Sequence, residues 1–525
     1  MEPFCVRQTS IPGTTKLFGD FLYHFDKVAT FYGKRFSDEA VWRKAANEIS
    51  YPDERRSRLV AALGEQNRDS ASLQKLAQSG TVAVVTGQQV GLFGGPAYSI
   101  FKALTAVKLA QDLEEQGIPA VPVFWLATED HDLAEVDHAW IFNSQASITR
   151  VSLSGTPATG GPVGAVPLNG IPLRELRNAL GNLPFAHEVV AHLEASYRAG
   201  TSMGSAFREF FQDLVKDLGL LFFDPLLPAN RAIAAPFLEQ TVEHIAELIP
   251  ALRQRDKELI KAGYHAQVHV EQDTSLLFLI DNGKRIPLRY KDGRFTAKDR
   301  VYAVEELQKV STQLSPNALL RPVMQDYLLP TIAYVGGPSE IAYMAQAEVV
   351  YRTLLGRMPV IFPRNSFTLV DEKSAKLLQR YRLTIPKLMG PQDQVEEHIS
   401  ASLVPPAMLE EFRTIRATLD GALSKFRTNL SSFDPTLEQS AQKSTAKIRY
   451  QLEKLSRKAA KEAMRRDAQA ARGAEYLTNF IYPHRHLQER FYSIVPFLAK
   501  YGMDLPQHLL QETQLICPDH VVRPL

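Results

Sequence analysis

Short runs of apolar residues alternate with longer segments of helical periodicity through the first two thirds of the chain. Each run is short and apolar at consecutive positions, as in strands of a parallel sheet that helices cover on both faces. The segments between them predict helices at 96–116, 204–218 and 338–355. The predicted strands are 81–86, 120–127, 219–223, 331–335 and 358–362. This alternation predicts an α/β fold with a Rossmann-like parallel-sheet core and right-handed crossovers.

Two stretches interrupt the α/β pattern. Short alternating segments at 147–168 predict a β-hairpin, and a helix follows it. A helical stretch at 230–262 then leads into a β-meander at 265–296. Its turns carry Asn282-Gly283 and Asp292-Gly293, which are typical of tight hairpins. We therefore expect two insertions between pieces of one core.

The last third has a different periodicity, with apolar residues spaced alternately by about four and three positions. Two such stretches flank Asp434 and Pro435, a pair suited to begin a helix. They predict an antiparallel coiled-coil hairpin. One hairpin has a narrow core that must lean on the body or on a second copy, which favours a homodimer. The apolar positions are Met408, Phe412, Ile415, Leu419, Ala422 and Phe426, then Leu437, Ala441, Ile448, Leu452, Leu455 and Ala459.

The pattern as a whole divides the chain into seven segments. They are N-terminal helices with the first half of the core (1–142), the first insertion (143–203), a core piece (204–229), the second insertion (230–320), the second half of the core (321–390), the coiled coil (391–475) and a tail that packs back on the core (476–525).

Composition excludes several classes of protein. The chain has 525 residues and a net charge of +2, which gives no sign of a nucleic-acid or membrane partner. Cys5 and Cys517 have no spacing that suggests a zinc cluster or a disulfide framework. The N-terminus has no signal-peptide pattern, and no apolar run is long enough to span a bilayer. We expect a cytoplasmic protein.

A glycine-rich loop follows the first predicted strand, and a helix begins after it at Pro96. A strand, a glycine loop and a helix N-terminus make an anion-binding corner, because bare backbone N–H groups and the helix dipole face one point. The loop matches neither the dinucleotide nor the P-loop pattern. Its candidate ligand-binding residues are Thr86, Gly87, Gln88, Gln89, Gly94 and Gly95. Lys102 lies opposite the apolar stripe of the helix, so we expect it to be solvated.

Consecutive titratable residues follow the strand at 120–127. They are Glu129, Asp130, His131 and Asp132. Ligands of open α/β sheets bind outside the carboxyl ends of strands, so this cluster is a candidate site. If the segment is helical, His131, Glu135 and His138 share one face and could hold a divalent metal. Acids that cap a helix, with histidines in ordinary hydrogen bonds, remain an alternative.

Three later segments place polar residues at the same edge of the predicted sheet. Gly336 and Gly337 repeat the design of a strand followed by glycines and a proline, and Glu340 lies in the first turn of the next helix. Arg321 suits a carboxylate clamp, although an ion pair with Asp326 would explain it equally well. Arg364 and Ser366 follow the last strand. Together these residues favour a single cleft.

Five blocks resemble the cysteine ligase family of bacillithiol biosynthesis, the BshC family. They are TGQQVGLFGGPAYSIFK, WLATEDHDLAEVDH, SPNALLRPVMQD, YVGGPSEIAYMAQ and YPHRHLQER, in the order of the family and over nearly the whole chain. The resemblance implies a core similar to class I synthetases and nucleotidyltransferases, two connecting-peptide insertions and a coiled coil that supports dimers. Arg485 stands where the family usually has glycine.

The resemblance also implies the reaction, which is the addition of L-cysteine to glucosaminyl-malate (GlcN-Mal) in the last step of the pathway. ATP is the implied activator of the cysteine carboxylate, although the synthetase motifs His-x-Gly-His and Lys-Met-Ser-Lys-Ser are absent. The need for a metal stays open.

The amine nucleophile must be neutral, so Asp130, His131 or Asp132 is expected to act as general base. Two alternatives are a metal-dependent hydrolase that uses His131, Glu135 and His138, and a non-enzymatic coiled-coil scaffold.

Overall fold

The parallel sheet at the centre of the larger unit fixes where ligands can bind. The computed structural model describes residues 2–68, 70–155 and 160–525. They form two units: residues 4–368 with 488–522, and residues 369–487 with the chain ends. The sheet of the first unit contains β2 (Val82–Gln88), β3 (Ala120–Leu126), β6 (Leu221–Phe223), β12 (Thr331–Gly336) and β13 (Val360–Pro363). All its pairings are parallel, which confirms the predicted core.

The strand order of this sheet is β13-β12-β2-β3-β6. Numbered along the chain, that order is 5-4-1-2-3, so the direction of winding reverses between β2 and β12. In doubly wound sheets the crevice at such a reversal, at the carboxyl ends of the strands, is the usual ligand site. The glycine loop after β2 and the Gly336-Gly337 pair at the end of β12 both lie at this point.

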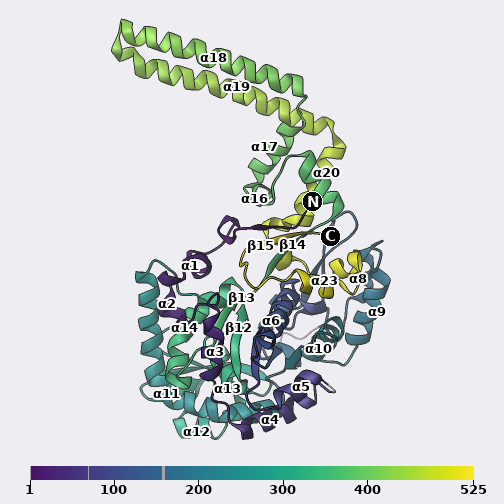
Figure 1. Cartoon of the computed structure of the whole chain (residues 1–525), viewed down its shortest axis with the longest axis vertical. Coiled ribbons are helices and arrows are strands. Elements are labelled where there is room, and N and C mark those ends of the chain that lie inside the picture. Colours follow the sequence, from purple (N-terminus) through teal and green to yellow (C-terminus); the bar gives the residue numbers. More distant parts are fainter. Residues whose placement is uncertain (1, 69, 156–159) are drawn as a thin grey trace. The chain divides into compact units, whose positions relative to one another are not determined.

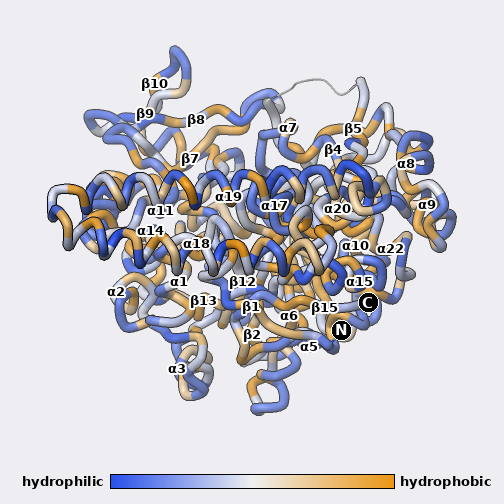
Figure 2. The backbone as a smooth tube through the Cα atoms, turned by 90° about the horizontal axis from the view of Figure 1, so that it is seen from above, coloured by the Kyte–Doolittle hydropathy of each residue, from blue (hydrophilic) through white to orange (hydrophobic). Residues whose placement is uncertain are grey.

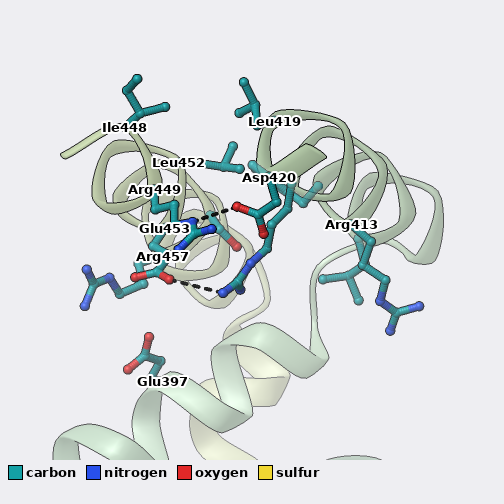
Figure 3. A pocket seen from close by; sticks show the side chains of 13 residues that line it. Glu397, Arg413, Leu419, Asp420, Ile448, Arg449, Leu452, Glu453 and Arg457 are labelled. Atoms are coloured by element: carbon teal, nitrogen blue, oxygen red, sulfur yellow. Dashed lines mark hydrogen bonds and ion pairs between the residues drawn. The ribbon is translucent and has the colours of Figure 1, made fainter. Parts of the chain in front are cut away.

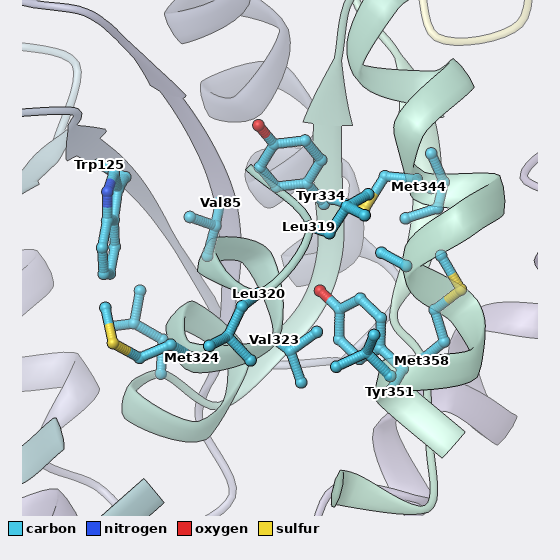
Figure 4. Packing of buried hydrophobic residues seen from close by; sticks show 14 of the residues in the cluster. Val85, Trp125, Leu319, Leu320, Val323, Met324, Tyr334, Met344, Tyr351 and Met358 are labelled. Atoms are coloured by element: carbon cyan, nitrogen blue, oxygen red, sulfur yellow. The ribbon is translucent and has the colours of Figure 1, made fainter. Parts of the chain in front are cut away.

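Helices pack on the faces of the sheet (Figure 1). Figure 4 shows Val85 and Trp125, from β2 and β3, near Leu320, Val323 and Met324 around the start of α13, and all five side chains are buried. The helices that follow or flank the strands are α6 (Tyr98–Glu115), α10 (Met203–Leu214), α11 (Pro228–Lys261), α13 (Arg321–Leu328) and α14 (Pro338–Leu355). The N-terminal helices are α1 (Lys16–Tyr23), α2 (Ala29–Tyr32), α3 (Ala40–Asn47), α4 (Asp53–Gly64) and α5 (Ala71–Leu76).

Helix α6 is buried on nearly every side, which the sequence pattern did not reveal. One face contacts β2 and β3, and another contacts α23 (Leu505–Glu512) near the C-terminus. The ring of Phe101 packs edge-on against Phe367, with centroids 4.9 Å apart. The side of α6 that was expected to be solvated, at Lys102, is therefore covered by protein.

The first insertion contains a hairpin that begins earlier than predicted. Strand β4 (His138–Phe142) pairs antiparallel with β5 (Ile148–Ser152). The hairpin predicted at 147–168 is therefore wrong in its position along the chain. The turn lies at 143–147, where Asn143 accepts backbone hydrogen bonds from Gln145 and Ser147. Part of the predicted hairpin, at 156–159, lies outside the described residues. Helices α7 (Leu133–Val136), α8 (Leu173–Leu180) and α9 (Ala186–Ser196) flank these strands.

The second insertion forms an antiparallel sheet of order β10-β9-β8-β7-β11. Asn282 and Asp292 have φ of 49° and 51°, and each precedes a glycine of positive φ, which confirms both predicted turns. The expected first strand of the meander, at 266–272, is wrong, because these described residues form no strand. The elements are β7 (Thr274–Asp281), β8 (Lys284–Lys291), β9 (Arg294–Ala297), β10 (Arg300–Tyr302), α12 (Val304–Gln308) and β11 (Leu314–Pro316).

The end of the chain returns to the first unit. Strand β15 (His520–Pro524) pairs antiparallel with β1 (Phe4–Val6), and β14 (Ser366–Val370) follows β13. The short helices of this segment are α21 (Gln488–Phe491), α22 (Val495–Tyr501) and α23. No helix of the described ranges is both long enough and apolar enough to cross a membrane.

The second unit contains the predicted helical hairpin. Helices α18 (Pro406–Phe433) and α19 (Glu438–Arg466) run side by side, and apolar and polar positions alternate along both (Figures 1 and 2). Asp434 caps the turn between them by accepting from Thr436 N at 2.8 Å. The helices are α15 (Glu372–Arg380), α16 (Ile385–Leu388), α17 (Gln392–Ser402), α18, α19 and α20 (Ala468–Ile481).

Candidate functional site

A cavity of about 660 Å³ opens at the carboxyl ends of β2 and β12, where the winding reverses. Its walls come from the loops after β2 and β3, from β7 and β8, from the approach to α13, from the N-terminus of α14 and from α21. The lining side chains that carry polar chemistry are Gln88, Gln89, Tyr98, Glu129, Asp130, His131, Glu135, Arg285, Asn317, Arg321, Ser339, Glu340, Tyr343, Arg364 and Arg490.

Lys102 lies directly beneath this cavity and is completely buried. Its Nζ donates to Gly87 O at 2.5 Å and Gln88 Oε1 at 3.1 Å, and lies 2.6 Å from Glu340 Oε2. Burial lowers the pKa of Lys102 to about 8, although Glu340 opposes this shift. The expectation of a solvated lysine is wrong, because the end of β2 and the first turn of α14 enclose the ammonium group of Lys102.

Glu340 joins the two halves of the sheet at this edge. It accepts from Lys102, from Gly337 N at 2.8 Å and from the Tyr334 hydroxyl at 2.6 Å. Burial alone would raise its pKa, but Lys102 and these hydrogen bonds outweigh burial and hold the pKa below its usual value. The residue therefore caps α14 and also forms the ion pair with Lys102.

Arg321 brings a guanidinium to the same end of the cavity. It donates to the hydroxyls of Tyr334 at 3.2 Å and Tyr343 at 2.8 Å, and to Gln325 Oε1. Asp326 instead bonds Tyr351 and Gln325, so the expected alternative of an Arg321–Asp326 ion pair is wrong. Among the described residues no carboxylate forms a salt bridge with Arg321, which leaves its charge available to a ligand.

Arg364 and Ser366 belong to one buried network with Glu489 of α21. Arg364 donates to both carboxylate oxygens of Glu489, at 2.6 and 3.1 Å, and Ser366 donates to Oε1 at 3.1 Å. His520 contacts Ser366 through Nδ1 at 2.5 Å and Thr368 through Nε2 at 2.7 Å. Burial lowers the pKa of His520 to about 4. Arg364 lines the cavity with its charge paired, whereas the Ser366 hydroxyl is turned into the network, so the expected pocket role of Ser366 is wrong.

The opposite wall of the cavity is acidic. Gln89 Nε2 donates to Asp130 Oδ2 at 2.7 Å and to Glu135 Oε2 at 2.9 Å, so one amide holds two carboxylates. Glu129 is buried and paired with Arg231, whose Nη1 lies 2.8 Å from its Oε1. Burial raises the pKa of Glu129 in spite of this partner. Glu129 thus anchors the wall, and Asp130 and Glu135 face solvent.

His131 has a fixed tautomer in this wall. Its Nδ1 lies 3.1 Å from Nη1 of Arg285, and a guanidinium can only donate, so Nδ1 is the acceptor. Arg285 lies over the ring of Phe278 at 3.9 Å and donates to Ser315 and Pro316. Burial lowers the pKa of Arg285. The antiparallel sheet of the second insertion therefore supplies part of the cavity.

Several candidates from the glycine loop lie away from the cavity. Gly94 N donates to the Tyr197 hydroxyl at 3.1 Å, and Gly95 N donates to Leu92 O. The prediction that these two N–H groups hold an anion is therefore wrong. Thr86 donates to Val335 O and ties β2 to β12. Asp132 is exposed and outside the cavity lining in the part of the chain that the structure describes, so it is poorly placed as a base.

The alternative of a metal site required His131, Glu135 and His138 to lie on one helix, and they do not. Helix α7 contains Leu133–Val136 alone, so His131 precedes it and His138 lies in β4. The three side chains do not share a helical face, and His138 Nδ1 instead contacts Asp137 at 2.9 Å. Across residues 2–68, 70–155 and 160–525, no group of three His, Cys, Asp or Glu side chains is arranged to hold a metal ion.

Sequence reasoning missed Tyr98, Arg285 and Arg490, which line the cavity. It also missed the support that Lys102 and Glu489 give from below the surface. Tyr98 and Lys102 stand in the quoted glycine-loop block, and Glu489 and Arg490 stand in or beside YPHRHLQER. The resemblance of those blocks to the family was the one signal that could have pointed to these residues. Arg285 lies just after the Asn282-Gly283 turn, and no local pattern marks it.

A second cavity, of about 330 Å³, lies along the helical hairpin (Figure 3). Ion pairs cross it between Arg449 and Asp420 at 2.7 Å and between Arg416 and Glu453 at 3.6 Å. Leu419 and Leu452 are nearby. These two ion pairs neutralise four of its charged side chains, so the cavity of the parallel sheet is the better candidate for chemistry.

Comparison with known proteins agrees with this architecture. Residues 4–365 match the model of the BshC N-terminal Rossmann-like domain of bacillithiol biosynthesis, and residues 367–523 match that of the BshC C-terminal coiled-coil domain.

Relatives align along most of their length. A protein of Solibacter usitatus is 50% identical over 522 residues, which is 99% of both chains. One of Koribacter versatilis is 38% identical over 532 residues, again 99% of both, and one of Symbiobacterium thermophilum is 32% identical over 493 residues, 88% of both. All three are named "Putative cysteine ligase BshC". These names support the expected ligase class, and the matches show that the chain belongs to the BshC family of bacillithiol biosynthesis.

Proposed function

We propose that the protein is the ligase that joins the carboxyl group of L-cysteine to the amine of GlcN-Mal, in the last step of bacillithiol biosynthesis. Membership of the BshC family supports the pathway. The observation that carries the proposal is the polarity of the cavity at the strand reversal, which has a cationic end and an acidic end. GlcN-Mal has the matching form, with an amine on the sugar and carboxylates on the malate.

The cationic end suits the anionic groups of the substrates. Arg321 lies there without a carboxylate partner among the described residues, and the hydroxyl of Tyr343 is beside it. Arg490 reaches the same cavity and lies over the ring of Tyr98 at 5.7 Å. The N-terminus of α14, at Pro338 and Ser339, adds the positive end of a helix dipole. A malate carboxylate held here would leave the sugar to extend across the cavity.

The acidic end suits the reacting amine. Asp130 keeps lone pairs free while it accepts from Gln89 and from His131 N. It can take the proton that the ammonium must lose before attack. His131 is less suitable as a base, since its Nδ1 already accepts from Arg285. We assign Asp130 as the general base and His131 as a positioning residue.

ATP would supply the activation of the cysteine carboxylate, which otherwise has no leaving group for amide formation. The loop around Gly94 and Gly95 does not fit the phosphates, because both N–H groups are used within the protein. The N-terminus of α14 with Arg321 and Arg490 fits an anion of this kind. The cationic end could therefore bind either the phosphates of ATP or the malate carboxylates. Substrate kinetics distinguish the two.

The test is formation of bacillithiol from GlcN-Mal, cysteine and ATP by the purified chain. We expect Asp130→Asn to lower kcat by about 100-fold or more, the usual effect of losing a general base. Asp132→Asn is the matched control, because Asp132 is an exposed acid of the same loop. Equal activity of the two variants would remove Asp130 from the mechanism. Absence of product from the unmodified protein with all three substrates would overturn the proposed reaction.

The same assay can show which substrate binds at the cationic end. Arg490→Ala raises KM for GlcN-Mal if this end binds malate, and raises KM for ATP if it binds phosphate. No change in either KM would exclude Arg490 from substrate binding.

We also infer a homodimer through the hairpin of α18 and α19. Ile415, Phe426 and Leu455 are 46%, 59% and 57% exposed, although they belong to the apolar series that predicted the coiled coil. A second, symmetry-related hairpin would bury these side chains in a four-helix bundle. Light scattering should give twice the chain mass. A double change, Phe426→Asp with Leu455→Asp, should give the mass of one chain, and Phe433→Asp at the turn is the control.

The cysteines support a cytoplasmic site for this reaction, because both are free thiols in the structure. Fractionation of cells that produce the protein should recover it with cytoplasmic markers.

A further inference from the structure

The two cysteines of the chain meet, although 512 positions separate them. Cys5 Sγ and Cys517 Sγ lie 3.6 Å apart, both as free thiols. Cys5 lies in β1, and Cys517 precedes β15 by three residues. Cys5 is exposed and Cys517 is partly exposed, so a small reagent can reach the pair.

The surrounding contacts hold the two sulfur atoms in place from both sides. Strands β1 and β15 pair in register, with Cys5 opposite Val521. The Tyr23 hydroxyl donates to Asp519 Oδ1 at 2.5 Å and accepts from Gln8 N at 2.8 Å. Gln8 Nε2 donates to Pro518 O. The segments that flank Cys5 and the segment that follows Cys517 are therefore tied by hydrogen bonds that do not involve sulfur.

We propose that Cys5 and Cys517 are a reversible modification site, at which exchange with a low-molecular-weight aliphatic disulfide forms an internal disulfide bond. The sulfur atoms need to approach by about 1.5 Å from their distance of 3.6 Å to reach bonding distance. Rotation of the side chains can supply a movement of this size, because Cys5 is exposed. The proposal does not depend on the ligase activity.

The exchange balances in two steps. The thiolate of one cysteine attacks the disulfide RSSR, which forms a protein–S–S–R bond, breaks the S–S bond of the reagent and releases RS⁻. The second cysteine then loses its proton and attacks the protein sulfur, forming the Cys5–Cys517 bond and releasing the second RS⁻. Two protein thiols are oxidised, the reagent is reduced to two thiols, and excess thiol reverses both steps.

The environment of Cys5 makes the exchange dependent on pH. Partial desolvation by the neighbouring chain and the hydrogen bond with Cys517 raise the pKa of the Cys5 thiol to about 11. Asp519, whose carboxylate also raises this pKa, and Arg7, which lies over the Tyr23 ring, are charged neighbours on the packed segments. Because the thiolate is the reactive form, we expect the exchange to be faster at pH 9 than at pH 7.

The bond would fix the position of β15. Strand β15 begins at His520, which contacts Ser366 and Thr368 in the buried network of Arg364. A disulfide that encloses such a long loop restricts the unfolded chain strongly. We therefore expect oxidation to raise the melting temperature by about 3–5 °C.

The experiment uses the full chain with hydroxyethyl disulfide, followed by intact mass and peptide mapping after alkylation. The expected result is a loss of about 2 Da, a linked peptide that contains both cysteines, and reversal by dithiothreitol. Cys5→Ser and Cys517→Ser are matched variants that keep one thiol each. Each should stop at the mixed disulfide, with a gain of about 76 Da, because no second thiol resolves it.

Other outcomes would overturn the proposal. Two stable mixed disulfides on the unmodified protein would show that the thiols react without joining. A covalent dimer on a non-reducing gel would show pairing between chains, and an unchanged thiol count at pH 9 would show no reaction. A linked peptide without a rise in melting temperature would exclude the stabilising effect on β15.

Discussion

Lys102 Nζ and Glu340 Oε2 lie 2.6 Å apart beneath the candidate cavity, where they join the helix that follows β2 to the helix that follows β12. The pair spans the point at which the sheet reverses its winding. Lys102 also donates to Gly87 O and Gln88 Oε1, and Glu340 accepts from Gly337 N. One ion pair therefore positions both glycine-containing turns of the site.

Replacement of Lys102 by methionine should destabilise the protein by about 3–5 kcal/mol, because it leaves the carboxylate of Glu340 without its cation in a buried position. Thermal unfolding with and without the change measures this. Lys108→Met is the control, since Lys108 lies in the same helix and is only half-buried. The double variant Lys102→Met with Glu340→Gln should recover part of the loss. Equal stability of the Lys102 and Lys108 variants would contradict the structural role of the pair.

Alanine at Gly94 and at Gly337 should have different effects. Gly94 has φ of 83°, and a Cβ there would meet the ring of Phe210 at 3.1 Å, so we expect a loss of about 1–3 kcal/mol. Gly337 has an ordinary φ, and its Cβ would lie 3.3 Å from Arg364 Nε at the cavity. We expect Gly337→Ala to change KM with little change in melting temperature. The reverse pattern would place the anion site back at the first glycine loop.

The stability of the first unit should fall as the pH drops from 6.5 to 4, in part because of His520. Burial lowers its pKa to about 4, whereas the unfolded chain has the ordinary histidine value of about 6.5. The unfolded state therefore binds the proton first, and the stability present above pH 6.5 is lost as the pH falls. Glu489, Arg364, Ser366 and Thr368 surround the ring.

The contribution of this one group is about 3 kcal/mol over that range. Denaturant unfolding at several pH values measures it, and the comparison is with His520→Asn, which should show a smaller slope. His187→Asn is the control, since His187 is exposed. Parallel slopes for the unmodified chain and the His520 variant would refute the assignment.

Lysine at position 321 should impair substrate binding even though it keeps the charge. The guanidinium donates to the Tyr334 and Tyr343 hydroxyls while facing the cavity, and an ammonium group cannot reproduce that planar fork. We expect Arg321→Lys to raise the KM of an anionic substrate by about 10-fold, or about 1.4 kcal/mol. Arg300→Lys, on an exposed strand of the second insertion, should leave KM unchanged. Equal KM values would show that Arg321 has a structural role only.

The fold was largely predictable because each core strand carries a local signal. Val82–Val85 and the later apolar runs are buried on both faces, and Asn282-Gly283 and Asp292-Gly293 adopt the backbone that their residues favour. The hairpin of the first insertion was displaced because Ala139, Ile141 and Val151 alternate less clearly than the segment after residue 160. Its strands depend on contacts that a short pattern does not contain.

The site was less predictable, because long-range contacts decide which polar groups face a ligand. Helical periodicity predicts that Lys102 is solvated, because it cannot show that Glu340, far later in the chain, pairs with that ammonium group. Gly94 has the positive φ expected of a loop glycine, yet its N–H group is used by Tyr197. Glu489 pairs with Arg364 from the far end of the chain, and no spacing between them encodes the contact.

Two different sheets supply the walls of the cavity, and this bears on how its selectivity can change. Phe278 and Arg285 come from the antiparallel sheet of the second insertion, and the remaining polar groups come mainly from the edge of the parallel sheet. Arg285 lies on a hairpin that the chain enters and leaves within one inserted stretch. Substitution or exchange of that hairpin can therefore reshape one wall of the pocket while the strands of the parallel sheet keep their positions.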